Sequence, residues 1–199
     1  MTSPETKTRY DYAAARRAMI DSQLRPSGVN ATRVLSRMNA IAREDYVPDN
    51  ARGIAYMDRS VPLGDGKFLP PPLFHGMMLE EARPLASDTV CIVSKAGDYL
   101  ADLIRPLVAH VEIVSLQEAL EGQTSACSLL LIDGAVEHVP DRLAQQVQQD
   151  GRAVLGIVQD GVTRLGRARK AGDALPIMPL MEMGIPRLPE FDKPKGWQF

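Results

Sequence analysis

Several features that would assign a protein to a special class are scarce in this chain of 199 residues. Only two cysteines are present, Cys91 and Cys127, which excludes a disulfide framework and a cysteine-based metal site. Lysine and arginine number 23 against 25 aspartates and glutamates, so the basic excess of a dedicated nucleic-acid binder is missing. The longest apolar runs, such as residues 128–132, are far too short to span a membrane, and the polar N-terminus lacks the apolar stretch of a signal peptide. We therefore expect a cytoplasmic protein that binds neither nucleic acid nor a membrane.

The first 82 residues have the patterns of helices and one loop. Residues 10–24 carry apolar side chains at helical spacing, and the Arg-Pro-Ser-Gly sequence that follows predicts the end of that helix. Asn30 is expected to cap a second helix, whose apolar stripe includes Val34 and Met38. Residues 62–72 predict a loop with a tight turn at Asp65-Gly66, because three consecutive prolines continue neither a helix nor a central strand. A short buried helix is expected over residues 73–82.

From Thr89 onward, short apolar runs alternate with amphipathic stretches. The run at 89–93 predicts a strand buried on both faces, and the runs at 110–114, 128–132 and 152–158 predict three more strands. Asp133-Gly134 is expected to end the third strand. Helices are expected over 98–107 and 139–149, and one or two more strands after Val162, before a proline-rich end at 186–199. Alternating strands and helices predict a three-layer α/β fold with a mostly parallel sheet and right-handed crossovers.

Few residues outside one turn point to chemistry. His75, His110 and His138 form no catalytic pattern and are interpreted as structural or surface residues, and Cys91 as a small hydrophobe in a buried strand. In nucleotide-binding α/β folds, the turn after the first strand is rich in glycine, so that the backbone can approach a ligand. Here that turn contains one glycine, Gly97, in the sequence VSKAGDY of residues 93–99. The turn is in the right place for a cofactor, but its sequence signal is weak.

Phrases spread over most of the chain resemble one enzyme family. Residues 43–48 (REDYVP) are similar to the phrase R-E-x-F-V-P, and residues 55–64 (AYMDRSVPLG) to A-Y-x-D-x-x-x-P-x-G. Residues 19–25, 133–140 and 149–154 add further similar passages in the same order, and the ends LPEF and WQF resemble those of a bacterial branch. The chain thus resembles the protein-L-isoaspartate O-methyltransferases, which use S-adenosylmethionine as cofactor to repair damaged proteins.

The family's functional motifs are the parts that differ. Its cofactor turn, V-L-E-V-G-T-G-S-G-Y, aligns with residues 90–99, where Ile92 replaces the acidic residue and Ser94, Ala96 and Asp98 replace the three glycines. An acid that holds the ribose hydroxyls is expected near Ser115, but the first carboxylate is Glu118. In the substrate loop Gly64 and Gly66 match, and Pro70 stands where the family has the serine that contacts the isoaspartyl group. A proline supplies neither a hydroxyl nor a backbone N–H.

The spacing of the strands adds a further difference. Only residues 116–127 separate the second predicted strand from the third, and one parallel crossover already needs about a dozen residues. The family's third strand and its adenine-contacting loop therefore have no room. The resemblance implies a reduced Rossmann-like class I methyltransferase fold with one edge strand deleted, divided into an N-terminal helical segment at 1–60 and an α/β domain at 61–199.

These observations lead to three hypotheses. In the first, the chain is a degenerate family member with weak or lost S-adenosylmethionine binding, kept for contacts with an isoaspartyl-containing peptide or another protein; a homodimer is left open. In the second, an active methyltransferase uses a rebuilt site, with Gly97, Tyr99 and Asp133 at the cofactor and Glu137 nearby. In the third, the chain is a binding module for a small anion or a peptide, with Lys67 and Lys95 near the ligand. No metal site is expected.

Overall fold

The computed structural model describes residues 10–193, and its N-terminal part is helical. Helix α1 (Tyr12–Met19) runs into a π-helical turn, Ile20–Leu24, and is followed by α2 (Thr32–Ala40) and by two short 3₁₀ helices, Arg43–Tyr46 and Asp49–Ile54. The prediction that Asn30 caps the second helix is wrong, because Ala31 occupies the N-cap position. The Glu80 carboxylate instead accepts hydrogen bonds from the backbone N–H groups of Asn30 and Ala31 at 3.1 and 2.9 Å.

The proline-rich segment expected as a loop contains a β-hairpin. Strands β1 (Val61–Gly64) and β2 (Lys67–Leu69) pair antiparallel around the predicted turn, where Asp65 and Gly66 have φ angles of 50° and 70°. A two-stranded ribbon tolerates Pro62 because both of its strands are edges. Helix α3 (Pro72–Ala82) begins at the last of the three prolines, where the missing N–H is not needed.

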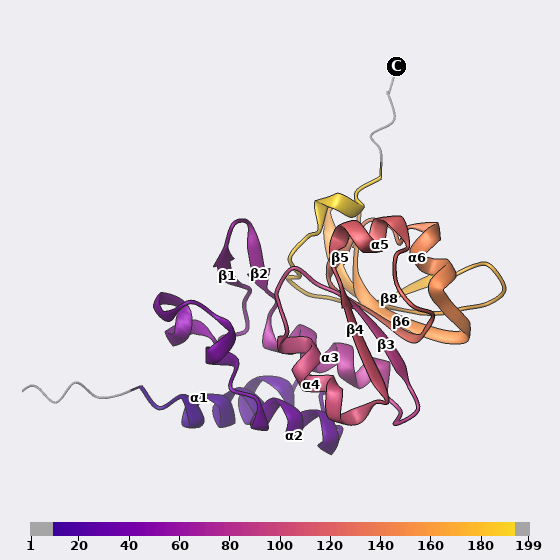
Figure 1. The fold of residues 1–199 in the computed structure, drawn as a ribbon. Helices are drawn as coiled ribbons and strands as arrows, with labels where there is room; N and C mark the ends of the chain where they lie inside the picture. Colours follow the sequence, from indigo (N-terminus) through magenta and orange to yellow (C-terminus); the bar gives the residue numbers. More distant parts are fainter. Residues whose placement is uncertain (1–9, 194–199) are drawn as a thin grey trace, which may run out of the picture.

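A six-stranded mixed sheet forms the centre of the molecule (Figure 1). Its spatial order is β4-β3-β5-β6-β7-β8, in which β4, β3, β5 and β6 are parallel and β7 and β8 antiparallel. The strands are β3 (Thr89–Val93), β4 (His110–Val114), β5 (Cys127–Val136), β6 (Val147–Gln159), β7 (Val162–Arg169) and β8 (Ile177–Glu182). The predicted bounds of β3 and β4 are confirmed.

Strands β5 and β6 are longer than predicted, and helices α4 and α6 are shorter. Strand β5 does not stop at Asp133-Gly134 but continues to Val136 through a register shift between Ile132 and Ala135. Helix α6 (Asp141–Gln146) is shorter than expected because β6 already begins at Val147. Helix α4 (Tyr99–Ile104) is likewise short and passes into the 3₁₀ turn Arg105–Leu107. The connection from β4 to β5 holds one helix, α5 (Leu116–Glu121).

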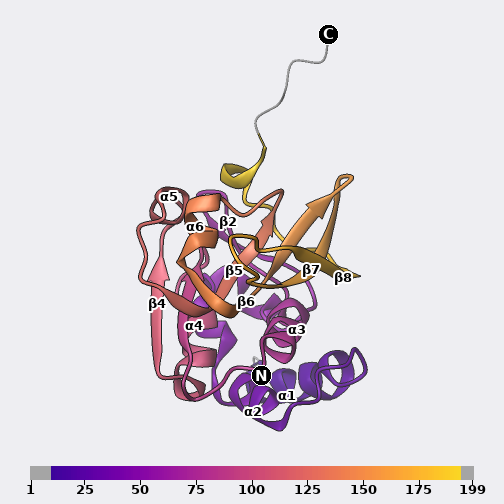
Figure 2. The same cartoon turned by 90° about the vertical axis from the view of Figure 1, so that its right-hand side faces the viewer.

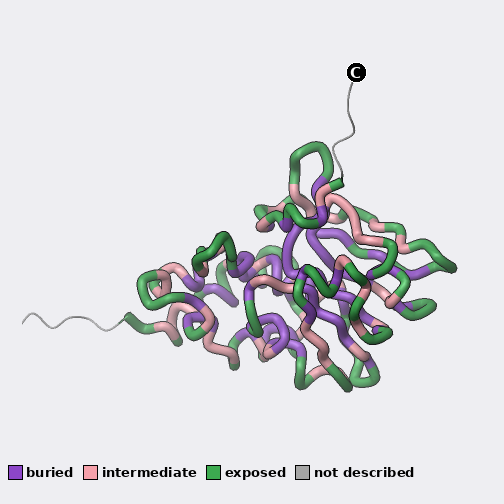
Figure 3. The backbone as a smooth tube through the Cα atoms, turned by 45° about the horizontal axis from the view of Figure 1, so that its top comes forward, coloured by how far each residue is buried: buried purple, intermediate pink, exposed green. Residues whose placement is uncertain are grey.

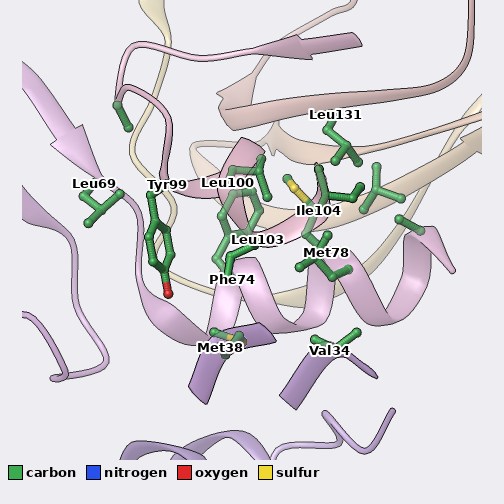
Figure 4. Close-up of a cluster of buried hydrophobic side chains, with 14 of the residues drawn as sticks. Val34, Met38, Leu69, Phe74, Met78, Tyr99, Leu100, Leu103, Ile104 and Leu131 are labelled. Atoms are coloured by element: carbon green, nitrogen blue, oxygen red, sulfur yellow. The ribbon is translucent and has the colours of Figure 1, made fainter. Parts of the chain in front are cut away.

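Each face of the sheet has its own hydrophobic core, which gives the predicted three layers (Figure 2). Side chains alternate along each strand, so Val90 and Ile92 face α2, α3 and α4, whereas Cys91 and Val93 face α5 and α6. Cys91 is fully buried, as predicted. Figure 4 shows the first core, where Met38, Phe74 and Leu131 gather around Tyr99 and its neighbours on α4. Buried residues run through the strands, and exposed ones are concentrated at the turns (Figure 3).

Candidate functional site

The turn after β3 lies at the carboxyl end of the parallel strands and is held together by its own hydrogen bonds. The hydroxyl of Ser94 donates to Oδ2 of Asp133 at 2.9 Å and accepts the backbone N–H of Ala96 at 2.9 Å. Gly97 has a φ angle of 80°, which is why the one glycine of the turn stands there. A backbone N–H that a ligand could use is thus already bonded to a side chain of the turn.

Asp133 also belongs to a buried chain of polar side chains that ends at Arg43. Its Oδ1 lies 2.7 Å from Nε2 of His75, and the guanidinium of Arg43 lies 3.2 Å from Nδ1 of His75. Because arginine can only donate, Nδ1 is the acceptor and the proton is on Nε2, which donates to Asp133. All three residues are buried, and burial lowers the pKa of His75. His75 is therefore a neutral link between a buried cation and a buried carboxylate.

Two further donors of Arg43 are bonded to backbone carbonyls. Nε donates to the carbonyl of Ala55 at 2.7 Å, and Nη2 donates to the carbonyl of Pro70. Pro70, the residue at the family's serine position, thus contributes its carbonyl to the buried network. Sequence analysis missed Arg43 as a site residue. The available signal was that Arg43 directly follows the apolar residues 40–42. A buried arginine requires a hydrogen-bonding partner inside the protein.

A second polar group continues this network toward α1. Tyr56 donates to the Glu44 carboxylate, Arg16 donates to the Tyr56 hydroxyl at 2.7 Å, and Arg16 pairs with Glu44 at 3.0 Å. The backbone N–H of Arg43 also donates to the Tyr56 hydroxyl at 3.2 Å. The polar network therefore links the N-terminal helices to the turn after β3.

Tyr99, predicted at the cofactor, lies inside the first hydrophobic core (Figure 4). The guanidinium carbon of Arg43 lies 4.9 Å from the centre of its ring, and the rings of His75 and Tyr46 lie 5.3 and 5.1 Å away. Burial raises the pKa of the Tyr99 hydroxyl, which has no hydrogen-bond partner among the described residues. Tyr99 packs against the buried network rather than facing an open crevice.

A segment near the C-terminus, residues 184–191, runs parallel to the carboxyl end of β5 and reaches the turn after β3; we call it the C-terminal strap. Ala135 of β5 donates to the carbonyl of Pro186 and accepts from the N–H of Leu188, both at 2.8 Å. Lys95 in the turn after β3 forms an ion pair with Glu190 of the strap. Leu188 and Phe191 are 3% and 0% exposed, which anchors the strap in the second hydrophobic core.

Two other carboxylates of the predicted sites, Glu118 and Glu137, also have partners within the chain. Glu118 and Ser115 form a capping box on α5, in which the Glu118 carboxylate accepts the N–H of Ser115 at 2.7 Å. These hydrogen bonds lower the pKa of Glu118. Glu137 pairs with Arg187 of the strap at 3.0 Å. Neither carboxylate is held free at the end of a strand.

An open cavity of about 590 Å³ lies between the hairpin and the strap. Gly66 and the half-exposed Phe68 of the hairpin form one wall, and Lys95 lies where the cavity meets the turn after β3. The strap supplies the opposite wall. The cavity therefore brings together part of the predicted substrate loop and a lysine of the predicted cofactor turn, while Gly64 lies at the end of β1.

Comparison with models of protein families identifies the family of this chain. Residues 14–126, more than half of the chain, match the model of the family described as Protein-L-isoaspartate(D-aspartate) O-methyltransferase (PCMT). The chain belongs to this family. A PCMT relative from Roseiflexus sp. (strain RS-1) is 29% identical over 191 residues, which cover 83% of this chain and 87% of the relative. One from Methylorubrum extorquens (strain PA1) is 27% identical over 190 residues, covering 80% and 83%.

Solved structures of PCMT proteins share the fold. A crystal structure from Plasmodium falciparum, in complex with S-adenosyl-L-homocysteine, has a TM-score of 0.62 and 13% identity, covering 90% of this chain and 99% of that one. A second, described as protein-L-isoaspartate O-methyltransferase, has a TM-score of 0.69 and 12% identity, covering 87% and 65%. The mixed, mostly parallel sheet thus matches the class I methyltransferase architecture of PCMT structures. Within residues 10–193, no helix is long and apolar enough to cross a membrane, and no cluster of three or more potential metal ligands occurs.

Proposed function

We propose that this chain is a degenerate PCMT-family protein that has lost useful affinity for S-adenosylmethionine and acts through contacts with a polypeptide. The observation that carries the proposal is that the Ser94 hydroxyl makes two hydrogen bonds, in which it accepts the N–H of Ala96 and donates to Asp133. A glycine-rich turn binds a cofactor through free backbone N–H groups and close approach of the backbone. In this turn the Ser94 side chain stands where the family has a glycine, and its hydroxyl accepts the N–H of Ala96. The residues present therefore do not fit the cofactor.

The C-terminal strap supports the same proposal from the opposite side. Ligands of open α/β sheets bind outside the carboxyl ends of the parallel strands. In this chain the strap pairs with Ala135 and is joined to the turn after β3 by Lys95 and Glu190. Because Leu188 and Phe191 are buried, moving the strap aside would expose core side chains.

The connection between β4 and β5 supports loss of the adenine pocket. Residues 115–126 hold α5 and two short linkers, and β4 is the edge strand of the sheet. The strand and the loop that the family resemblance places beyond β4 have no counterpart in this connection. The capping box also engages Glu118, the first carboxylate after β4, with its own helix.

A rebuilt active site around Gly97, Tyr99, Asp133 and Glu137 is the alternative, and the contacts of these residues weigh against it. Asp133 accepts from both Ser94 and His75, and Glu137 pairs with Arg187. Tyr99 is in the core with its ring face against Arg43. Asp133 is buried with both of its oxygens already bonded, and turning it toward a cofactor would take the counter-charge away from the buried cation.

The cavity between the hairpin and the strap is the surface that we propose for the polypeptide. Its volume of about 590 Å³ is in the range of ordinary ligand sites, and Phe68 offers an exposed aromatic anchor beside Lys95. Lys95 pairs with Glu190 of the same cavity, so the peptide suited to this combination is an extended one whose carboxylate takes the place of Glu190 at Lys95. An isoaspartyl peptide is the family's own example, and an acidic segment of another protein has the same chemistry.

Calorimetric titration of the full chain with S-adenosylmethionine and S-adenosyl-L-homocysteine tests the proposal. We expect no saturable heat in the micromolar range, in parallel with saturable binding by the Roseiflexus relative as positive control. The variant Ser94→Gly frees the N–H of Ala96 and serves as the matched comparison. Micromolar binding by the unmodified chain, or transfer of labelled methyl groups to an isoaspartyl peptide, would overturn the proposal.

Peptide binding is measured separately, without cofactor. A fluorescent isoaspartyl peptide and its normal aspartyl counterpart are titrated with the chain and with the variant Phe68→Ser. Weaker binding by the variant supports the hairpin cavity as the polypeptide site. Equal binding by both proteins, or no binding of either peptide, contradicts that site.

A further inference from the structure

A second cavity, lined by arginines, lies at the other end of the sheet. It has a volume of about 530 Å³ and contains Glu81, Ala153, Val154, Ala168, Pro176, Met178 and the four arginines 83, 152, 167 and 169. Helix α3 packs against β6 and β7 at this place (Figure 2). Arg83 follows the end of α3, six residues before β3 begins, so the cavity is at the amino ends of the parallel strands. It is therefore separate from the turn after β3, which is at their carboxyl ends.

Arg152 is the structural member of this group. Its guanidinium donates to the carbonyls of Ala82 and Arg83, at 2.6 and 3.1 Å, and to both oxygens of Asp88 at 3.0 and 2.5 Å. These bonds satisfy carbonyls at the C-terminal end of α3 and hold the start of β3. Arg152 contributes charge to the cavity, but it has little capacity left for a ligand.

The other three arginines keep most of their donors. Arg167 makes one hydrogen bond, to Glu81 at 3.0 Å, and Arg169 makes one long contact, to Asp150 at 3.4 Å. The side chain of Arg83 has no hydrogen bond or ion pair among residues 10–193. Each guanidinium carries five N–H donors, so the rim of the cavity holds a surplus of unused, positively charged donors.

Two features of the backbone concentrate this charge. Arg152 and Arg169 are direct partners in the β6–β7 register, and like charges directly opposite each other are unfavourable. Arg83 has a φ angle of 44°, in the left-handed region where a helix end ordinarily carries glycine. An arginine is therefore present at a position where its backbone conformation is strained, and its side chain makes no hydrogen bond or ion pair within residues 10–193.

The floor of the cavity is apolar. Val154 is buried beneath it and Met178 is half-exposed at its edge, whereas the side chains of Ala153 and Ala168 face the second hydrophobic core on the other side of the sheet. Arginine binds phosphate and carboxylate groups in bidentate fashion, and an apolar floor favours a ring or chain attached to that group. We propose that this cavity binds an amphipathic organic anion, a phosphate monoester on an apolar body, through Arg83, Arg167 and Arg169. This proposal does not depend on the proposed function.

The experiment titrates the full chain with 2-naphthyl phosphate by calorimetry and repeats the titration with inorganic phosphate and with 2-naphthol. We expect saturable binding of the ester and clearly weaker binding of either half alone. The variant Arg83→Gly removes one cation and relieves the strained φ angle, so it folds at least as well as the parent chain. It should bind the ester about tenfold more weakly, as expected for the loss of one charge-assisted contact.

Two further variants make the test specific. Arg167→Gln removes a second rim cation and should weaken binding by a similar factor. Arg164→Gln is the matched control, because Arg164 is on the same strand but pairs with Glu182 and does not line the cavity. Equal loss in the control and the rim variants, unchanged binding by both rim variants, or no saturable binding by the parent chain would each overturn the proposal. If inorganic phosphate bound as tightly as the ester, the proposed contribution of the apolar floor to binding would be wrong.

Discussion

Charged side chains gather at both ends of the parallel strands, but they are buried and hydrogen-bonded at one end and exposed with few partners at the other. At the carboxyl end, Asp133, His75 and Arg43 are buried and bonded to one another, and the Ser94 hydroxyl satisfies the turn. At the amino end, Arg83 and Arg169 are exposed around an open cavity with few partners. The end where this fold ordinarily binds its ligand is thus self-satisfied, and the opposite end has unused donors. From this difference we expect the state of the polar groups, as well as their position in the fold, to decide where a ligand binds.

The largest effect that we expect comes from breaking the buried network at its carboxylate. Asp133→Ala leaves Arg43 without a counter-charge in the core, which should lower the free energy of unfolding by about 3–5 kcal/mol. Asp133→Asn keeps an acceptor for His75 and should cost less, which separates the hydrogen bond from the charge. Urea denaturation of both variants measures the difference.

The control for this prediction is Asp21→Ala. Asp21 is exposed on the surface and pairs with Arg25 at 3.4 Å, so its loss should change stability by less than about 0.5 kcal/mol. If Asp133→Ala were as mild as this control, the carboxyl end of the sheet would not be the tightly coupled structure that we describe.

The second effect concerns the C-terminal strap. Leu188→Ala removes a buried side chain and should cost about 2–5 kcal/mol in urea denaturation. The same substitution at Leu85, which is 54% exposed, provides the comparison and should have little effect. A negligible cost at Leu188 would mean that the strap lifts easily, and the carboxyl-end crevice would then be accessible to a ligand.

Sequence predicted the sheet better than it predicted the site, for a physical reason. Strands such as Thr89–Val93 are local apolar runs, so their bounds follow from neighbouring residues. The hairpin was missed because its prolines are tolerated at edge strands, and the continuation of β5 past Gly134 depends on a register shift against β6. The register shift depends on a strand that is distant in the sequence, whereas the hairpin pairs residues 61–64 with residues 67–69 close by.

The turn after β3 was located correctly, and its poverty in glycine indicated a weak ligand site. The partners that occupy it could not be deduced, because Ser94, His75 and Arg43 come from three separate segments. The sequence interprets His75 as a structural or surface residue and does not identify its partners. A histidine and an arginine in apolar surroundings do indicate that an internal carboxylate exists, but they do not identify Asp133.

A third, smaller effect is a pH dependence that arises at the carboxyl end. Burial lowers the pKa of His75 from its usual value of 6.5, so the folded chain keeps it neutral where the unfolded chain binds a proton. Its contribution is present above pH 6.5 and is lost as the pH falls, by at most about 1.4 kcal/mol per pH unit for one proton. His75→Gln should remove this part of the slope. Urea denaturation at several pH values gives both slopes, and identical slopes would show that His75 is protonated in the folded chain.

The smallest effect that we expect is at the ion pair between the turn and the strap. Lys95 and Glu190 keep 30% and 39% of their side-chain surface exposed, and pairs of this kind contribute about 0–1 kcal/mol. Lys95→Ala should therefore change stability by less than about 1 kcal/mol, and high salt should reduce even that difference. The strap would remain in place, because its anchors are Leu188 and Phe191, and amide hydrogen exchange at Leu188 should stay slow in the variant. Fast exchange there would make Lys95 the element that keeps the crevice closed, and opening of the strap would then be controlled by one exposed charge rather than by the core.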